Sequence, residues 1–209
     1  MSRRGAFVGF VGLDGSGKTT QARRAVAWLV GHGVDARFLP NRSLLDVRVM
    51  LDAVAARRGW TNHFQMWGPE TARVIAALIK RNDLSGLPRM LADPGTVVVA
   101  DRAVTCQLAA LHACGAHNEV LVRNVFSDLP RPDVHVMLHV DPRVAYRRVL
   151  GRGSGTEDYQ YLVDLQEGYR QLPDYSSFHV IDGDGGADDV EARVRDTLAP
   201  LLRRRGLPV

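Results

Sequence analysis

Short apolar runs alternate along this chain with longer stretches in which apolar residues recur at helical spacing. Residues 7–11 read as a buried strand, and the apolar positions between residues 22 and 30 follow the i, i+3, i+4, i+7 pattern of an amphipathic helix. Further runs of strand length occupy residues 34–39, 97–100, 134–140 and 178–181. This alternation predicts an α/β fold with a parallel sheet and helices on both faces.

The intervening stretches are long enough for helices, which we predict at residues 44–57, 67–83, 105–113, 118–127, 142–150, 159–172 and 187–203. No internal repeat or low-complexity linker interrupts them. With 209 residues, 45% of them apolar, the chain can bury a sizeable core. We therefore expect a single domain over residues 1–209.

Charge, hydropathy and the spacing of cysteines and histidines indicate which kinds of partner and ligand the protein is not expected to bind. The net charge is +4 and the pI about 9.4, but the arginines are dispersed and much of the surplus lies in the final turn at 203–205, so no nucleic acid polymer is expected. No apolar run approaches the roughly 18 residues of a membrane span, so we expect no membrane partner and a cytoplasmic location. Cys106 and Cys114 lack metal-ligand spacing and are predicted to be reduced core residues. His135 and His139 alternate along one strand and are interpreted as sheet residues, not metal ligands.

The segment FVGFVGLDGSGKTT at residues 7–20 carries the clearest chemical signal. It fits the phosphate-binding pattern GxxxxGK[ST] directly after a strand and before a helix, which makes a chance glycine-rich turn the weaker interpretation. Main-chain N–H groups of such a loop converge on phosphate oxygens, while Lys18 adds positive charge and the Thr19 hydroxyl is placed to ligate Mg²⁺. The pattern predicts binding of ATP with Mg²⁺. The residues predicted to bind this cofactor are Gly12, Asp14, Gly15, Ser16, Gly17, Lys18, Thr19 and Thr20.

Asp101 and Arg102 end the apolar run at 97–100. In an open parallel sheet, ligands bind beyond the carboxyl ends of the strands, where this pair would project. Asp101 is placed to orient Mg²⁺ or its water, and Arg102 to bind a phosphate with its forked guanidinium. The structural alternative is an ion pair that closes the strand.

A basic helix end followed by glycines, at residues 147–158, has the composition of a lid. Such a segment can close over a triphosphate and deliver an arginine to the transferred phosphoryl group. Arg148 and Arg152 are the candidates for this role. A solvated helix face followed by a flexible loop explains each arginine nearly as well.

Together, these segments resemble the thymidylate kinase family of P-loop nucleoside monophosphate kinases. The resemblance rests on GLDGSGKTTQ at 12–21, LPNRS at 39–43, the Asp-Arg pair at 101–102, Pro-Asp at 132–133, Asp-Pro at 141–142 and Glu-Gly-Tyr at 167–169. It covers nearly the whole chain. It implies the three-layer P-loop NTPase fold, with a five-stranded parallel sheet flanked by helices, and a homodimer.

Residue by residue, the resemblance implies that Arg42 and Arg102 grip the acceptor phosphate and that Asp14 faces the acceptor sugar or the metal. Counting back without gaps from Arg102 puts Arg81 where the family has an arginine that touches the base. Gln107 is a further substrate-binding candidate. The candidate catalytic residues are Asp14, Lys18, Arg102, Arg148 and Arg152, and the candidate metal ligands are Thr19 and Asp101.

The same alignment shows departures in the base pocket. Ala77 stands where the family has an aromatic residue that stacks on thymine, while Ala103 and Ala110 replace larger residues; a ring from Trp60, Phe64 or Trp67 is a possible substitute. The implied activity is transfer of the ATP γ-phosphoryl group to dTMP or a related pyrimidine nucleotide. Two alternatives stay open: a nucleoside kinase with Asp14 as the base, and a catalytically weak nucleotide-binding switch.

Overall fold

A five-stranded parallel sheet forms the centre of the computed structural model, which describes residues 4–42, 45–152 and 158–209. The strand order is β2-β3-β1-β4-β5, and every neighbouring pair is parallel. The strands are β1 (Ala6–Gly12), β2 (Asp35–Leu39), β3 (Thr96–Asp101), β4 (Val134–His139) and β5 (His179–Asp182). The predicted α/β fold with five parallel strands is confirmed.

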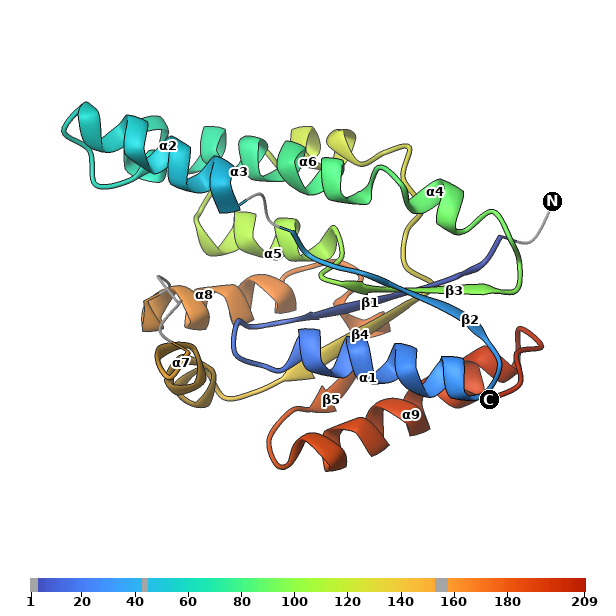
Figure 1. Ribbon diagram of the computed structural model, residues 1–209. Helices are drawn as coiled ribbons and strands as arrows, with labels where there is room; N and C mark the ends of the chain where they lie inside the picture. Colours follow the sequence, from blue (N-terminus) through green and yellow to red (C-terminus); the bar gives the residue numbers. More distant parts are fainter. Residues whose placement is uncertain (1–3, 43–44, 153–157) are drawn as a thin grey trace.

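Helices cover both faces of this sheet (Figure 1). One layer holds α1 and α9, which contact each other; the other holds α5 and α8, with α2, α3, α4 and α6 outside α5. The helices are α1 (Lys18–Gly31), α2 (Leu45–Arg57), α3 (His63–Leu84), α4 (Leu87–Met90), α5 (Thr105–Ala113), α6 (Glu119–Val125), α7 (Pro142–Leu150), α8 (Tyr159–Arg170) and α9 (Ala187–Arg203), with a 3₁₀ turn at Tyr175–Ser177.

The alternation of side chains along each strand divides the core into two clusters. In β1, Phe7 and Val11 pack towards α5 and α8, whereas Val8 and Phe10 pack towards α1 and α9. All seven residues of β1 are buried, as expected for a central parallel strand that is covered on both faces.

Gly168 allows α8 to pack closely on α5. A Cβ at this position would collide with the backbone carbonyl of Ala109 and lie 3.3 Å from the amide nitrogen of Ala113. The pair α5 and α8 makes the most extensive helix–helix contact among the described elements. This packing fixes α8 beside the carboxyl ends of the strands, where the candidate site lies.

The structure corrects several predicted boundaries and burials. Helix α3 starts at His63, not at residue 67, because the Asn62 side chain caps it by accepting from the Gln65 amide. The helix contains a kink at Gly68 (φ 77°, ψ 162°), followed by Pro69. The four-residue α4 and the 3₁₀ turn were not predicted, since neither is long enough to show a helical period. Both cysteines are free, but only Cys106 is a core residue; Cys114 is half-buried.

Candidate active site

Three glycines with positive φ shape the turn between β1 and α1. At Gly12 (φ 133°) a Cβ would lie 2.5 Å from the Leu138 carbonyl oxygen, and at Gly15 (φ 86°) it would collide with the Ala145 carbonyl. Gly17 (φ 94°) caps α1 in the left-handed conformation, with no atom within 4 Å of its Cβ position. The turn therefore needs glycine, and it leaves open space beside the first amides of α1, where a phosphate is favoured. The turn therefore fits the phosphate groups of ATP.

Lys18 folds back over the same turn. Its side chain is 5% exposed, its ammonium donates to the Leu13 carbonyl, and it lies 3.8 Å from Asp14 Oδ1 and 3.5 Å from Ser16 Oγ. Ser16 is buried, whereas Thr20 points to solvent. The positive charge is thus held within the loop that would receive the triphosphate.

Thr19 and Asp101 come together from α1 and β3. The Thr19 hydroxyl donates to Asp101 Oδ2 at 2.6 Å, and the other carboxylate oxygen, Oδ1, is buried with no hydrogen bond from any described residue. A hydroxyl beside a carboxylate with a buried, unused oxygen is the donor set that Mg²⁺ prefers. The two residues predicted as metal ligands therefore fit this ion.

Arg102 adopts a conformation that is rare for a residue with a side chain. Its φ is 75°, the only positive value outside glycine in the described part of the chain, and its N–H donates to the Phe10 carbonyl at 3.1 Å. The guanidinium forms an ion pair with Asp14 of the phosphate loop. Strained backbone of this kind persists where the surrounding structure enforces it, and it often occurs at functional sites.

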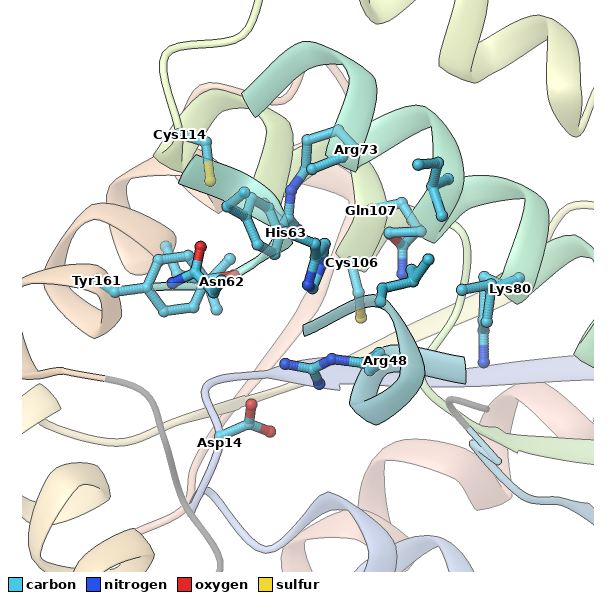
Figure 2. A pocket seen from close by; sticks show the side chains of 18 of the residues that line it. Asp14, Arg48, Asn62, His63, Arg73, Lys80, Cys106, Gln107, Cys114 and Tyr161 are labelled. Atoms are coloured by element: carbon cyan, nitrogen blue, oxygen red, sulfur yellow. The ribbon is translucent and has the colours of Figure 1, made fainter. Parts of the chain in front are cut away.

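A cavity of about 730 Å³ opens from Asp14 and Arg102 towards α2, α3, α5 and α8 (Figure 2). Its walls combine apolar residues such as Ile75, Ala76 and Leu165 with a dense set of polar groups. This composition suits a ligand with one flat, partly apolar portion and several hydrogen-bonding groups. The cationic residues of the lining are Arg48, Arg73, Lys80 and Arg102.

A sequence model of the thymidylate kinase family, described as "Thymidylate kinase", matches residues 10–194. The chain belongs to this family. It is 31% identical over 199 residues to the probable thymidylate kinase of Methanothermobacter thermautotrophicus, an alignment that covers 93% of this chain and 94% of that protein. It is 26% identical over 215 residues to the thymidylate kinase of Caldicellulosiruptor saccharolyticus, covering 97% and 100% of the two chains.

Arg81, the residue that the family resemblance assigned to the base, lies outside the cavity. Its guanidinium binds the Asp128 carboxylate with two hydrogen bonds of 2.6 and 2.8 Å and the Val125 carbonyl at 2.8 Å. Successive helical residues are turned by about 100°, so Arg81 and the neighbouring Lys80 point in different directions from α3. Arg73 and Lys80, seven residues apart and thus on one face, line the cavity instead.

The predicted losses in the base pocket also need correction. Ala110 lines the cavity, but Ala77 and Ala103 do not: both are fully buried, and Ala103 packs beneath Gly9 of β1. Of the three substitute rings that the sequence offered, Phe64 is in the lining.

Phe64 instead serves as a platform for Arg73, whose guanidinium carbon lies 4.4 Å from the ring centroid. Gln107, on α5, also lines the cavity, and its buried side-chain oxygen has no hydrogen bond from any described residue. An unused acceptor and a fixed guanidinium facing one cavity are suited to the polar edge of a base.

His63 was not identified from the sequence and lies in the cavity wall. It is 5% exposed; its Nδ1 is 2.5 Å from Asp52 Oδ1, and its backbone N–H donates to the same oxygen at 2.9 Å. Burial raises the pKa of Asp52, but these two hydrogen bonds from His63 outweigh that effect and the pKa is lowered. The two contacts with Asp52 hold the His63 imidazole at the wall of the cavity.

Of the arginines predicted at the lid and after the second strand, Arg148 lies beside the phosphate loop, whereas Arg152 and Arg42 are exposed. Arg148, on α7, lies 3.4 Å from the carbonyl oxygens of Gly15 and Gly183, directly beside the phosphate loop. Arg152 is exposed, and residues 153–157 of the predicted lid lie outside the described residues. Arg42 is also exposed; its backbone N–H donates to Asp83 at 3.2 Å, and its side chain is not part of the cavity lining, where Arg48 lies instead.

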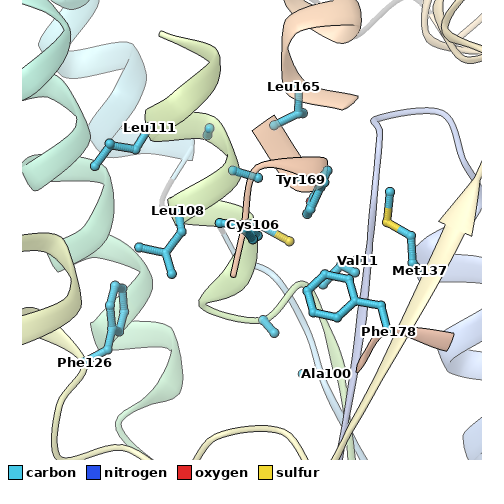
Figure 3. Close-up of a cluster of buried hydrophobic side chains, with 14 of the residues drawn as sticks. Val11, Ala100, Cys106, Leu108, Leu111, Phe126, Met137, Leu165, Tyr169 and Phe178 are labelled. Carbon is cyan, nitrogen blue, oxygen red and sulfur yellow. The ribbon is translucent and has the colours of Figure 1, made fainter. Parts of the chain in front are cut away.

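Tyr169 lies on α8 among the buried side chains of the core (Figure 3), and its hydroxyl contacts Gly12, the first residue of the phosphate loop. It is fully buried, and its hydroxyl accepts from the Gly12 N–H at 3.3 Å and donates to the Gly12 carbonyl at 3.4 Å. Burial raises the pKa of this hydroxyl well above its usual value of 10. Tyr169 belongs to the Glu-Gly-Tyr segment of the resemblance, and its contacts explain how that segment supports the loop.

Proposed function

We propose that this protein transfers the γ-phosphoryl group of ATP to the phosphate of dTMP or a related pyrimidine nucleotide, giving ADP and a nucleoside diphosphate. The observation that carries the proposal is that a phosphate-binding loop and a polar cavity, with Lys80 and Arg102 in its lining, meet at Asp14 and Arg102. One site suits the triphosphate, and the other suits a second nucleotide whose phosphate faces the first. The names of the relatives support the same activity.

Positioning and electrostatics supply the catalysis in this proposal. The loop amides and Lys18 bind the donor phosphates, while Arg102, freed from Asp14, holds the acceptor phosphate in line. Thr19 and Asp101 would hold Mg²⁺, which neutralises charge on the donor phosphates when bound. Arg148, beside Gly15, stabilises the charge that develops on the transferred group. No general base is required, because a phosphate monoester already presents an anionic oxygen.

The nucleoside kinase alternative gives Asp14 the role of proton acceptor. Asp14 pairs with Arg102 and lies 3.8 Å from Lys18. The carboxylate is therefore already engaged by two cations. Lys80 and Arg102, both in the cavity lining, offer positive charge that a phosphorylated acceptor can use and a neutral nucleoside cannot.

A coupled assay of ADP release tests the proposal against both alternatives. The panel contains dTMP, dUMP, dCMP, their ribose counterparts and the corresponding nucleosides, with Lys18→Ala as the inactive control. Turnover with a pyrimidine monophosphate supports the proposal. Turnover with nucleosides alone favours a nucleoside kinase, and tight ATP binding without acceptor-stimulated turnover favours a switch. Wild-type-like turnover by Lys18→Ala refutes the assignment of the loop.

The proposal includes a homodimer, which the family resemblance implies. The adjoining helices α3 and α6 expose Leu78, Val120 and Leu121, which are 54%, 73% and 51% accessible. A second copy of the chain would cover these apolar side chains. Light scattering coupled to size-exclusion chromatography tests this: a dimer that Leu78→Glu converts to monomer supports it, and a monomeric wild type contradicts it.

A further inference from the structure

Lysine is rare in this chain, and both lysines are buried near the candidate site. Of 27 basic residues, only Lys18 and Lys80 are lysines; the others are arginines. Lys18 belongs to the phosphate loop, whereas Lys80 lies on α3, and no part of the phosphate-binding pattern accounts for it. The two side chains are 5% and 3% exposed.

Lys80 lacks the counter-ion that a buried ammonium normally has. Its Nζ donates to Asn41 Oδ1 at 3.1 Å, and it forms no direct ion pair with a residue in the described ranges. Burial lowers its pKa, an effect that Cys106, Asp83 and Asp101 oppose from a distance. A buried charge with one neutral partner is unfavourable unless something else supplies the opposite charge.

The position of Lys80 indicates what that counter-ion is. The side chain lines the cavity (Figure 2) and reaches Asn41, just beyond the end of β2. Strand β3, which pairs with β2, ends at Asp101 and is followed by Arg102. Lys80 therefore lies where the carboxyl ends of these two neighbouring strands meet, on the side of the cavity that contains Arg102.

We propose that Lys80 is a substrate-binding residue whose ammonium pairs with the phosphate of the acceptor nucleotide, and that it selects a phosphorylated acceptor over the free nucleoside. This inference rests on the proposed function. It differs from a purely structural role, in which Lys80 would only hold Asn41 in place. Binding of the phosphate would place an anion in direct contact with the buried ammonium.

Lys80→Met tests the proposal because it removes the charge and keeps most of the apolar stem. Arg89→Met is the matched control: it removes an exposed cation on α4 that is not part of the cavity lining. Dissociation constants for dTMP and for thymidine are measured by calorimetry on each protein. A charge-assisted hydrogen bond to the phosphate predicts that Lys80→Met weakens dTMP binding about 10- to 100-fold, and thymidine binding less than about 3-fold.

The control variant should leave both constants within about 2-fold of wild type. Equal weakening of dTMP and thymidine by Lys80→Met indicates a structural role and overturns the proposal, as does an unchanged preference for the phosphorylated ligand. Lys80→Arg keeps the charge and should retain most of that preference.

A second measurement follows the two lysines of the wild-type protein and does not depend on the base. Because lysine occurs twice, a sample with ¹⁵N-labelled lysine gives two side-chain ammonium signals, which Lys80→Arg assigns. Inorganic phosphate, dTMP and thymidine are titrated separately. The Lys80 signal should move with the first two and stay in place with thymidine. A Lys80 signal that neither phosphate nor any monophosphate moves overturns the inference.

The two proposals fail in different ways. A wild type that phosphorylates no monophosphate contradicts the proposed function, although a phosphate-dependent shift of Lys80 would still show that it binds an anion. A wild type that is active, with an unchanged ligand preference in Lys80→Met, contradicts only the role of Lys80.

Discussion

Replacing Tyr169 with Phe tests the link between α8 and the phosphate loop. The hydroxyl is fully buried and its contacts with Gly12 N–H and C=O are long, at 3.3 and 3.4 Å. Removing it leaves a buried N–H without this partner, which costs about 1–2 kcal/mol, the lower part of the usual range for an unsatisfied group. For a domain of about 200 residues, each kcal/mol lowers Tm by roughly 2–4 °C. We therefore expect Tm to fall by about 2–8 °C.

Calorimetry and urea unfolding measure this loss, with Tyr175→Phe as the matched control. Tyr175 is half-buried and packs edge-on against Phe178, but its hydroxyl has no hydrogen bond to a described residue. Its variant should stay within about 0.5 kcal/mol of wild type. If both variants lose the same stability, or Tyr169→Phe loses none, the hydroxyl does not hold the loop and the reasoning is wrong.

The same hydroxyl predicts a dependence on pH. Its pKa is raised in the folded protein, so folded Tyr169 keeps its proton at a pH where the unfolded side chain, with a pKa near 10, has lost it. The folded state then holds more protons, and stability falls as pH rises above about 10. The difference in unfolding free energy between wild type and Tyr169→Phe should shrink over that range. A constant difference contradicts the assignment.

Three further predictions concern charge and metal. Arg148→Met should lower kcat about 100-fold or more while changing ATP affinity little, whereas Arg143→Met, on an exposed part of α7, should be near wild type; equal kcat values contradict the role of Arg148. Thr19→Val should weaken ATP binding in the presence of Mg²⁺ more than in EDTA, as calorimetry can measure, while exposed Thr20→Val should not; equal losses in both buffers would argue against a metal ligand. Burial lowers the pKa of Lys80 in the folded protein below the usual value of 10.5. At pH values just below 10.5 the unfolded chain therefore binds more protons than the folded protein, and the free energy of unfolding rises with pH over this range. Lys80→Met should remove that rise in urea unfolding curves, and a variant with the wild-type slope contradicts it.

Local sequence patterns predicted the sheet and the phosphate loop well, because both depend on short-range periodicity and on glycine geometry. The strand at β1, the turn with Gly12 and Gly17, and the start of α1 are each specified by adjacent residues. The meeting of Thr19 with Asp101 followed from a general rule that parallel strands end at one edge.

The wall of the cavity was harder to predict, since it depends on which face of α3 turns inwards. Counting along the sequence led to Arg81, whereas Arg73 and Lys80, seven residues apart, lie on the face of α3 that lines the cavity. The dyad of His63 and Asp52 joins residues of two helices whose packing angle no local pattern specifies. The kink at Gly68 further shifts the start of α3 relative to its later turns.

The left-handed backbone at Arg102 lowers the stability of the fold, whereas the side chain of Arg102 is needed for the proposed reaction. A side chain in that conformation costs roughly 1–2 kcal/mol that glycine would not incur. A library selected only for resistance to heat should therefore be enriched in Arg102→Gly, and those survivors should melt later yet have lost turnover. A screen for more thermostable variants of this protein must therefore measure product formation in every round. Selection by heat alone would favour variants that have lost Arg102, the residue between the two proposed nucleotide sites.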